Sequence, residues 1–144
     1  MASHNWEVKG ADEIIAAFTE GAKQVTPLLG VAVRGVAVEL KTGTQRNAHG
    51  RPGPNAPTAE YIASWQNLPT ENKKDAEPGV ERVSWSVFSD QVQAHRLEFG
   101  YVGTDAAGRH VDAPPYPHMG PARAAIEPLF YAAMEKVAEQ ATRW

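Results

Sequence analysis

Residues 96–130 read RLEFGYVGTDAAGRHVDAPPYPHMGPARAAIEPLF, and this stretch decides the fold because it leads from a sheet region into the last helix. Glu98 lies between the apolar residues Leu97 and Phe99, and Gly100 follows directly. A carboxylate in this position can accept hydrogen bonds from backbone N–H groups at the end of an element, with Leu97 and Phe99 as packing residues. A buried general base is the alternative interpretation. We prefer the structural one because it is the more economical.

The second half of this stretch approaches the helix through a run of prolines. Pro117, Met119 and Pro121 precede a stripe of apolar residues at helical spacing, which predicts a helix over residues 121–142. Pro121 suits the first turn because its missing N–H would have no intrahelical partner there. Pro128 interrupts the stripe and predicts either a kink or a helix that starts only at Pro128.

Two segments nearer the N-terminus predict helices. Residues 11–21 begin with acids and repeat apolar side chains at helical spacing, which favours a short first helix. Residues 27–41, PLLGVAVRGVAVELK, start with a proline that suits a first helical turn. Their valines partly alternate, as in a buried strand, but the run is long for a strand and apolar almost all round. We therefore predict a second, buried helix.

Three shorter segments lie between these helices and the proline run. Residues 80–88 alternate a tryptophan and two valines with polar residues, which predicts a half-buried strand. Residues 91–100 fit either a returning strand or a short helix, and spacing does not decide between them. Residues 59–66 fit either a short helix or an extended piece that anchors the preceding loop to the core.

Two long stretches show no regular period and predict loops. Residues 43–58 contain three glycines and three prolines, and residues 67–79 are strongly polar. Loops of this length are uncommon in a compact domain unless they bind a partner or stay disordered alone, so we expect both to be mobile in the free subunit and ordered on assembly. A solvated linker is the alternative, and nearby acids partly cancel the charge of the second loop. The candidate interface residues of the two loops are Arg46, His49, Arg51, Lys73 and Lys74.

Length and composition narrow the class of protein. The 144 residues suit a single domain, residues 1–144, and the mixture of helices and strands predicts an α+β fold. The net charge of -3 lacks the basic excess of a chain that binds nucleic acid stably. Without cysteine the chain has no disulfide and no thiolate metal site, which fits a reducing cytoplasm. No apolar run has the length of a signal peptide core or a membrane span.

Motifs that carry a catalytic mechanism are missing from the sequence. It has no phosphate-binding glycine loop, no Gly-x-Ser-x-Gly elbow and no His-Glu-x-x-His motif. The best remaining candidate is a metal site formed by His95, His110, Asp112 and His118, but their spacing is irregular and surface histidines are the default interpretation. We expect no cofactor and no enzymatic activity, and keep a metal-dependent hydrolase using His95, His110 and Asp112 as the alternative.

Three short motifs occur in a fixed order along most of the chain. The first is represented by Ala56, Pro57, Ile62 and Ser64, the second by residues 97–100, and the third by Pro117, Met119, Pro121 and Ala122. In this order they resemble the tail-component family of long-tailed bacteriophages. The sequence departs from the family pattern at Thr58, Ala59 and Glu60, which replace Asp-Thr-Gly, at His118, which replaces a phenylalanine, and at Gly120.

The resemblance implies a fold and a function. The fold would have N-terminal helices and a C-terminal helix packed on a small antiparallel sheet. The function would be a non-enzymatic head-to-tail connector subunit, called a neck, tail-completion or minor tail protein, that forms a hexameric ring in the virion after assembly in the host cytoplasm. Its neighbours would be head-closure or adaptor proteins and tail-terminator or tail-tube proteins, with at most passive contact with genomic DNA. A tail terminator and a head-closure ring are the structural alternatives.

Overall fold

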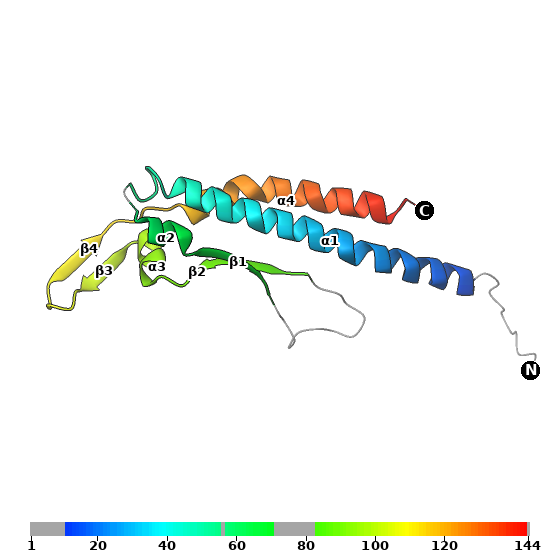
Figure 1. Ribbon diagram of the computed structural model, residues 1–144, viewed down its shortest axis with the longest axis horizontal. Helices are drawn as coiled ribbons and strands as arrows, with labels where there is room; N and C mark the ends of the chain where they lie inside the picture. The colour runs from blue at the N-terminus through cyan, green and yellow to red at the C-terminus, as the bar shows by residue number, and fades with distance from the viewer. Residues whose placement is uncertain (1–10, 56, 71–82, 144) are drawn as a thin grey trace, which may run out of the picture.

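The computed structural model describes residues 11–55, 57–70 and 83–143, with the side chains of residues 11–19, 22 and 24 left aside. Long helices and two antiparallel two-stranded sheets alternate along this part of the chain, so the predicted α+β class is confirmed. Two helices form an elongated antiparallel pair, one sheet lies along it, and the other projects at one end (Figure 1).

Helix α1 runs without interruption from Ala11 to Asn47. The prediction of two separate helices was wrong, because Pro27 lies inside α1 instead of starting a new element. The loop predicted from residue 43 begins only after Asn47. Gly43 is helical, and a Cβ there would lie 3.3 Å from the Cβ of Ala122 on the facing helix. Close packing of the two helices therefore explains this glycine and extends α1 into the predicted loop.

Helix α4, Met119–Ala141, runs antiparallel beside α1 (Figure 1). It begins two residues before Pro121 and continues through Pro128, so a helix that starts only at Pro128 is ruled out. The small or branched residues Ala122 and Val137 are buried where α4 meets α1. Tertiary packing along both helices thus outweighs the backbone hydrogen bond that Pro128 removes.

The first sheet joins β1, Trp65–Pro69, to β2, Trp85–Ser89, and both strands contact α1. The prediction of a strand near residues 80–88 is confirmed for its second half. Residues 67–69 belong to β1, so the start of the second predicted loop was wrong. Those residues pair with Val87, Ser86 and Trp85 in turn. The part of the second predicted loop from residue 71 on, including Lys73 and Lys74, lies outside the described residues.

Short elements lie on either side of this sheet in the chain. Helix α2, Ala59–Ala63, precedes β1, and helix α3, Val92–Phe99, follows β2. Residues 92–99 therefore form the short helix, not the returning strand. Strands β3, Tyr101–Thr104, and β4, His110–Ala113, then pair only with each other and project from the body (Figure 1).

The main core cluster lies between α2, β1 and α3. Tyr61, Trp65 and Ala94 are buried there, and Leu97 is among the partly buried residues packed against them. Phe99 is 70% exposed, so its predicted packing role was wrong. Residues two apart share one face of a strand but point in different directions on a helix. Because this segment is helical, only Leu97 of the pair reaches the core.

Candidate functional site

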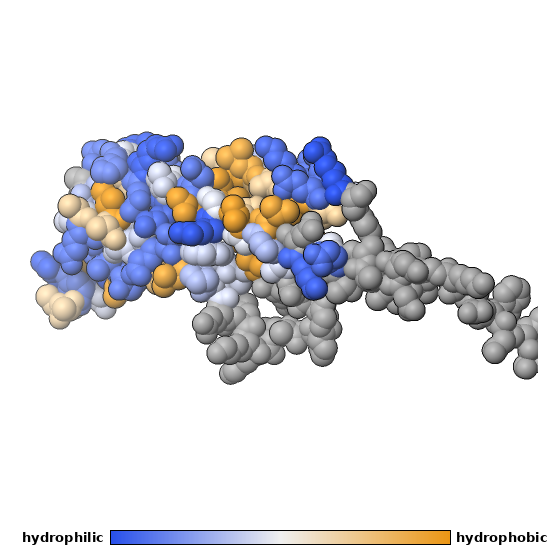
Figure 2. Space-filling view, turned by 45° about the vertical axis from the view of Figure 1, so that its right-hand side comes forward, coloured by the Kyte–Doolittle hydropathy of each residue, from blue (hydrophilic) through white to orange (hydrophobic). Residues whose placement is uncertain are grey.

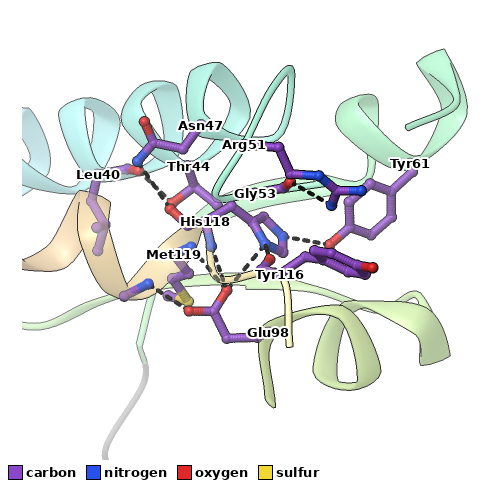
Figure 3. Close-up of polar contacts among 11 residues, drawn as sticks. Leu40, Thr44, Asn47, Arg51, Gly53, Tyr61, Glu98, Tyr116, His118 and Met119 are labelled. Carbon is purple, nitrogen blue, oxygen red and sulfur yellow. Dashed lines mark hydrogen bonds and ion pairs between the residues drawn. The ribbon is translucent and has the colours of Figure 1, made fainter. Parts of the chain in front are cut away.

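Glu98 caps the N-terminus of α4 although it lies 20 residues earlier in the chain (Figure 3). Its Oε2 accepts hydrogen bonds from the backbone N–H groups of His118 at 2.9 Å and Met119 at 3.0 Å. Its Oε1 accepts one from Gly120 at 2.7 Å. His118, the residue before the helix, provides no side-chain cap of its own. Glu98 therefore satisfies three of the donors that a helix start leaves free, which is the structural role predicted for it.

The cap determines the charge of the Glu98 carboxyl. Burial raises its pKa, but hydrogen bonds from the backbone N–H groups of His118, Met119 and Gly120 lower it by more. The pKa therefore lies below its usual value, and the group is a carboxylate at neutral pH. This negative charge lies at the positive end of the α4 dipole, which adds to the stabilisation.

His118 is completely buried, and both of its ring nitrogens have partners. Nδ1 lies 2.9 Å from the carbonyl oxygen of Tyr116 and 3.1 Å from Oε2 of Glu98. Nε2 lies 2.7 Å from the hydroxyl of Tyr61. Because both neighbours of Nδ1 are acceptors, the consistent neutral arrangement has the proton on Nδ1, while Nε2 accepts from the Tyr61 hydroxyl.

Tyr61 completes this polar cluster from the opposite side. Its side chain is 1% exposed, and burial raises the pKa of its hydroxyl to about 12. The nearby Trp65 side chain lowers that pKa, although its indole N–H has no hydrogen-bond partner among the described residues. The rings of Trp65 and His118 meet edge to face at 5.6 Å. The Tyr61 hydroxyl is thus a neutral, buried group that can donate to His118.

Side chains from the end of α1 attach the same cluster to the long helix. Asn47 donates from Nδ2 to the carbonyl oxygen of His118 at 3.1 Å. Gln45 donates from Nε2 to the carbonyl oxygen of Ile62 at 2.9 Å. The backbone N–H of Tyr116 donates to the carbonyl oxygen of Leu97 at 2.6 Å. We call Tyr61, Glu98 and His118, with these attachments, the polar node.

Parts of the three sequence motifs lie at or beside the polar node, and Ala56 of the first motif lies outside the described residues. Pro57 of the first motif, Leu97 of the second and Tyr116, next to the third, line one cavity of about 590 Å³ together with Tyr61. The second motif caps the helix that the third begins. Gly100 ends α3 with φ of 78°, and a Cβ there would lie 2.9 Å from the Ala113 carbonyl oxygen, so the motif needs glycine at this point.

Three of the basic residues predicted to contact a partner lie within the described residues, whereas Lys73 and Lys74 do not. Arg46, His49 and Arg51 line a separate cavity of about 300 Å³ with Pro117 and Pro121. The guanidinium of Arg51 also lies 4.1 Å from the centre of the Tyr116 ring, at a distance typical of a cation–π contact. Arg46 lies in the last turn of α1, so its predicted place in the loop was wrong, but it still lies beside His49, Arg51 and the third motif.

The four candidate metal ligands are dispersed. His95 on α3 packs its ring against Phe99 at 4.9 Å, and His110 and Asp112 lie exposed on β4. His118 is enclosed in the polar node. Among the described residues no three His, Cys, Asp or Glu side chains are placed to hold a metal ion. His95, His110 and Asp112 are therefore not placed to hold one metal ion together.

Comparison with protein-family models, with curated proteins and with solved structures finds no match for this chain. Within the described part of the chain, no helix has both the length and the apolar character needed to cross a membrane.

The sequence pattern indicated Glu98 but not the partners that complete the polar node. Tyr61 is 57 residues from His118, and Asn47 is 71 residues from it. No periodic pattern connects residues so far apart. The available signal was His118 itself, a polar residue inside a motif that otherwise has apolar positions.

Proposed function

We propose that this chain is a structural subunit of a long-tailed phage virion that forms a ring between the head connector and the tail tube. The observation that carries the proposal is the convergence of the three motifs on the polar node. Glu98 of the second motif accepts from Met119 of the third and so joins α3 to α4. Tyr61, which lies between two positions of the first motif, joins α2 to this helix start through His118, a position where the sequence departs from the family pattern. The resemblance thus involves the parts that determine the fold.

The distribution of apolar side chains supports an assembling subunit. Among the described residues, the buried hydrophobic residues number seven, of which four are alanines. Larger apolar side chains remain exposed, several of them over the helical pair (Figure 2). A small core with so much exposed apolar surface is typical of a protein that buries the rest against partners. The exposed residues are Val31, Val38, Leu68, Phe88, Val92, Phe99, Val102, Leu129 and Tyr131.

These exposed residues lie on different elements, which fits a ring. Val31 and Leu129 lie on the helical pair, whereas Phe99 and Val102 lie on α3 and the projecting hairpin. A closed ring of identical subunits needs two different surfaces that meet head to tail. The net charge of -3 suits a subunit that has at most passive contact with DNA. A hexamer is the ring we propose.

Native mass spectrometry tests the proposal. The purified protein is measured alone and after mixing with phage tail tubes, with filled heads, and with matching fractions from uninfected cells. We expect ring-sized masses, or sedimentation with one phage particle and not with the uninfected control. Capture by tail tubes favours a tail terminator, and capture by heads favours a head-closure ring. A protein that stays monomeric with every fraction and carries a stoichiometric metal would overturn the proposal in favour of the hydrolase.

A further inference from the structure

An apolar cleft lies between β2, α3 and the start of α4. It has a volume of about 410 Å³, and its wall includes Trp65, Val87, Phe88, Phe99, Met119 and Arg123. Phe88 is 37% exposed and Phe99 is 70% exposed at its rim. Large aromatic side chains at the edge of an open cleft are characteristic of surfaces that receive another protein.

The β3–β4 hairpin is a small element with an exposed apolar side chain. Its two strands pair only with each other, and two-stranded hairpins are marginally stable in water without further packing. Val102 pairs with Asp112 across the strands, so the two side chains share one face of the hairpin. Val102 is 69% exposed there. This face therefore presents an apolar side chain beside a carboxylate.

Local contacts shape the hairpin before any partner is bound. At the tip, Oδ1 of Asp105 accepts from the backbone N–H groups of Ala107 and Arg109, both at 2.9 Å, and Oδ2 accepts from Nε of Arg109 at 2.7 Å. At the root, the guanidinium of Arg96 lies 4.1 Å from the centre of the Tyr101 ring. A preorganised element loses less entropy when it docks, which favours its use as an interface.

Charge complementarity links the hairpin to the cleft. Arg123 is exposed at the cleft wall, and Asp112 is exposed beside Val102. The ion pairs found in the described part of the chain leave both of these side chains unpaired. A hairpin with Val102 inside the cleft would bring opposite charges to its edge.

The occupant must come from another subunit. Phe99 at the cleft rim is followed at once by Gly100 and β3, and the hairpin leads away from the body (Figure 1). We propose that the cleft receives the β3–β4 hairpin of a second copy of this chain, with Val102 in the cleft and Asp112 paired with Arg123. This inference rests on the proposed ring, since hairpin and cleft are different surfaces and their contact is head to tail.

Charge exchange tests the ion pair in the ring. Asp112→Arg and Arg123→Asp each place like charges together, and each is expected to weaken assembly by roughly tenfold or more. The double variant restores opposite charges and is expected to recover assembly in native mass spectrometry. Glu139→Arg and Arg143→Asp are matched controls at exposed positions away from the cleft and hairpin, and they are expected to assemble like the wild type. Assembly of both single cleft and hairpin variants at wild-type concentration would overturn the inference.

Site-specific cross-linking gives a second readout because the chain contains no cysteine. Val102→Cys and Phe88→Cys subunits of different mass are mixed and oxidised, and circular dichroism confirms that each is folded. We expect mixed disulfide dimers in excess over dimers of either variant alone. Wild-type rings without this mixed product would overturn the hairpin contact and leave the ring intact. Absence of oligomers and of all cross-links would overturn the proposed function as well.

Discussion

Replacing Glu98 by glutamine is expected to weaken the junction between α3 and α4. The carboxylate accepts three backbone hydrogen bonds and contacts Nδ1 of His118. Glutamine retains one acceptor oxygen, but its NH2 group would face backbone donors. A cap contributes about 0.5–2 kcal/mol, and a hydrogen bond to a charged group about 1.5–3 kcal/mol. We expect the free energy of unfolding to fall by about 2–3 kcal/mol at pH 7.

The same carboxylate makes stability depend on pH. Its pKa is lower in the folded protein than the ordinary value of about 4.3, so the folded state binds the proton less tightly than the unfolded state. The contribution is therefore complete above the unfolded pKa and is lost as the pH falls through the folded pKa. Glu98→Gln is expected to reduce the loss of stability in this acidic range.

Urea denaturation followed by circular dichroism measures both effects at a series of pH values. Glu127→Gln is the matched control, because Glu127 is exposed on α4, and it is expected to change stability by less than about 0.5 kcal/mol. A Glu98→Gln protein with wild-type stability at pH 7 and an unchanged acid slope would refute the capping argument.

Three further outcomes are expected for variants of the polar node and of Gly100. Tyr61→Phe leaves Nε2 of His118 buried without a donor and is expected to cost about 1–3 kcal/mol in urea denaturation. The pKa of about 12 at Tyr61 is above the unfolded value of about 10, so stability that is complete below pH 10 is lost towards pH 12, and Tyr61→Phe is expected to remove part of that loss. Gly100→Ala is expected to destabilise by more than about 1 kcal/mol, and by more than Gly108→Ala, in thermal unfolding. Both glycines have positive φ, but only at Gly100 would a Cβ meet the Ala113 carbonyl oxygen, so equal effects would contradict the steric explanation.

Local sequence patterns predicted the type of each helix or strand better than its first and last residues. Alternation identified β2, and helical spacing identified α4, because both patterns reflect which face is buried. Pro27 misled the division of α1, since a proline that suits a helix start can also lie within a helix when packing supports it. The length of α1 depends on its contact with α4. Asn47 and His118, which meet at this contact, are 71 residues apart, so no local sequence pattern predicts it.

His118 departs from the family pattern, yet its side chain is tightly packed and hydrogen-bonded. The resemblance places a phenylalanine here, which would fill the core without hydrogen bonds. A buried histidine needs partners for both ring nitrogens, and the chain supplies the Tyr61 hydroxyl on one side and the Tyr116 carbonyl with Glu98 on the other. The ring still packs edge to face against Trp65, as an aromatic side chain would. The histidine thus combines aromatic packing with polar contacts that join α2, α3 and the start of α4. Because these contacts share Glu98 with the α4 cap, we expect a change at any member of the polar node to affect the helix start that forms one wall of the apolar cleft.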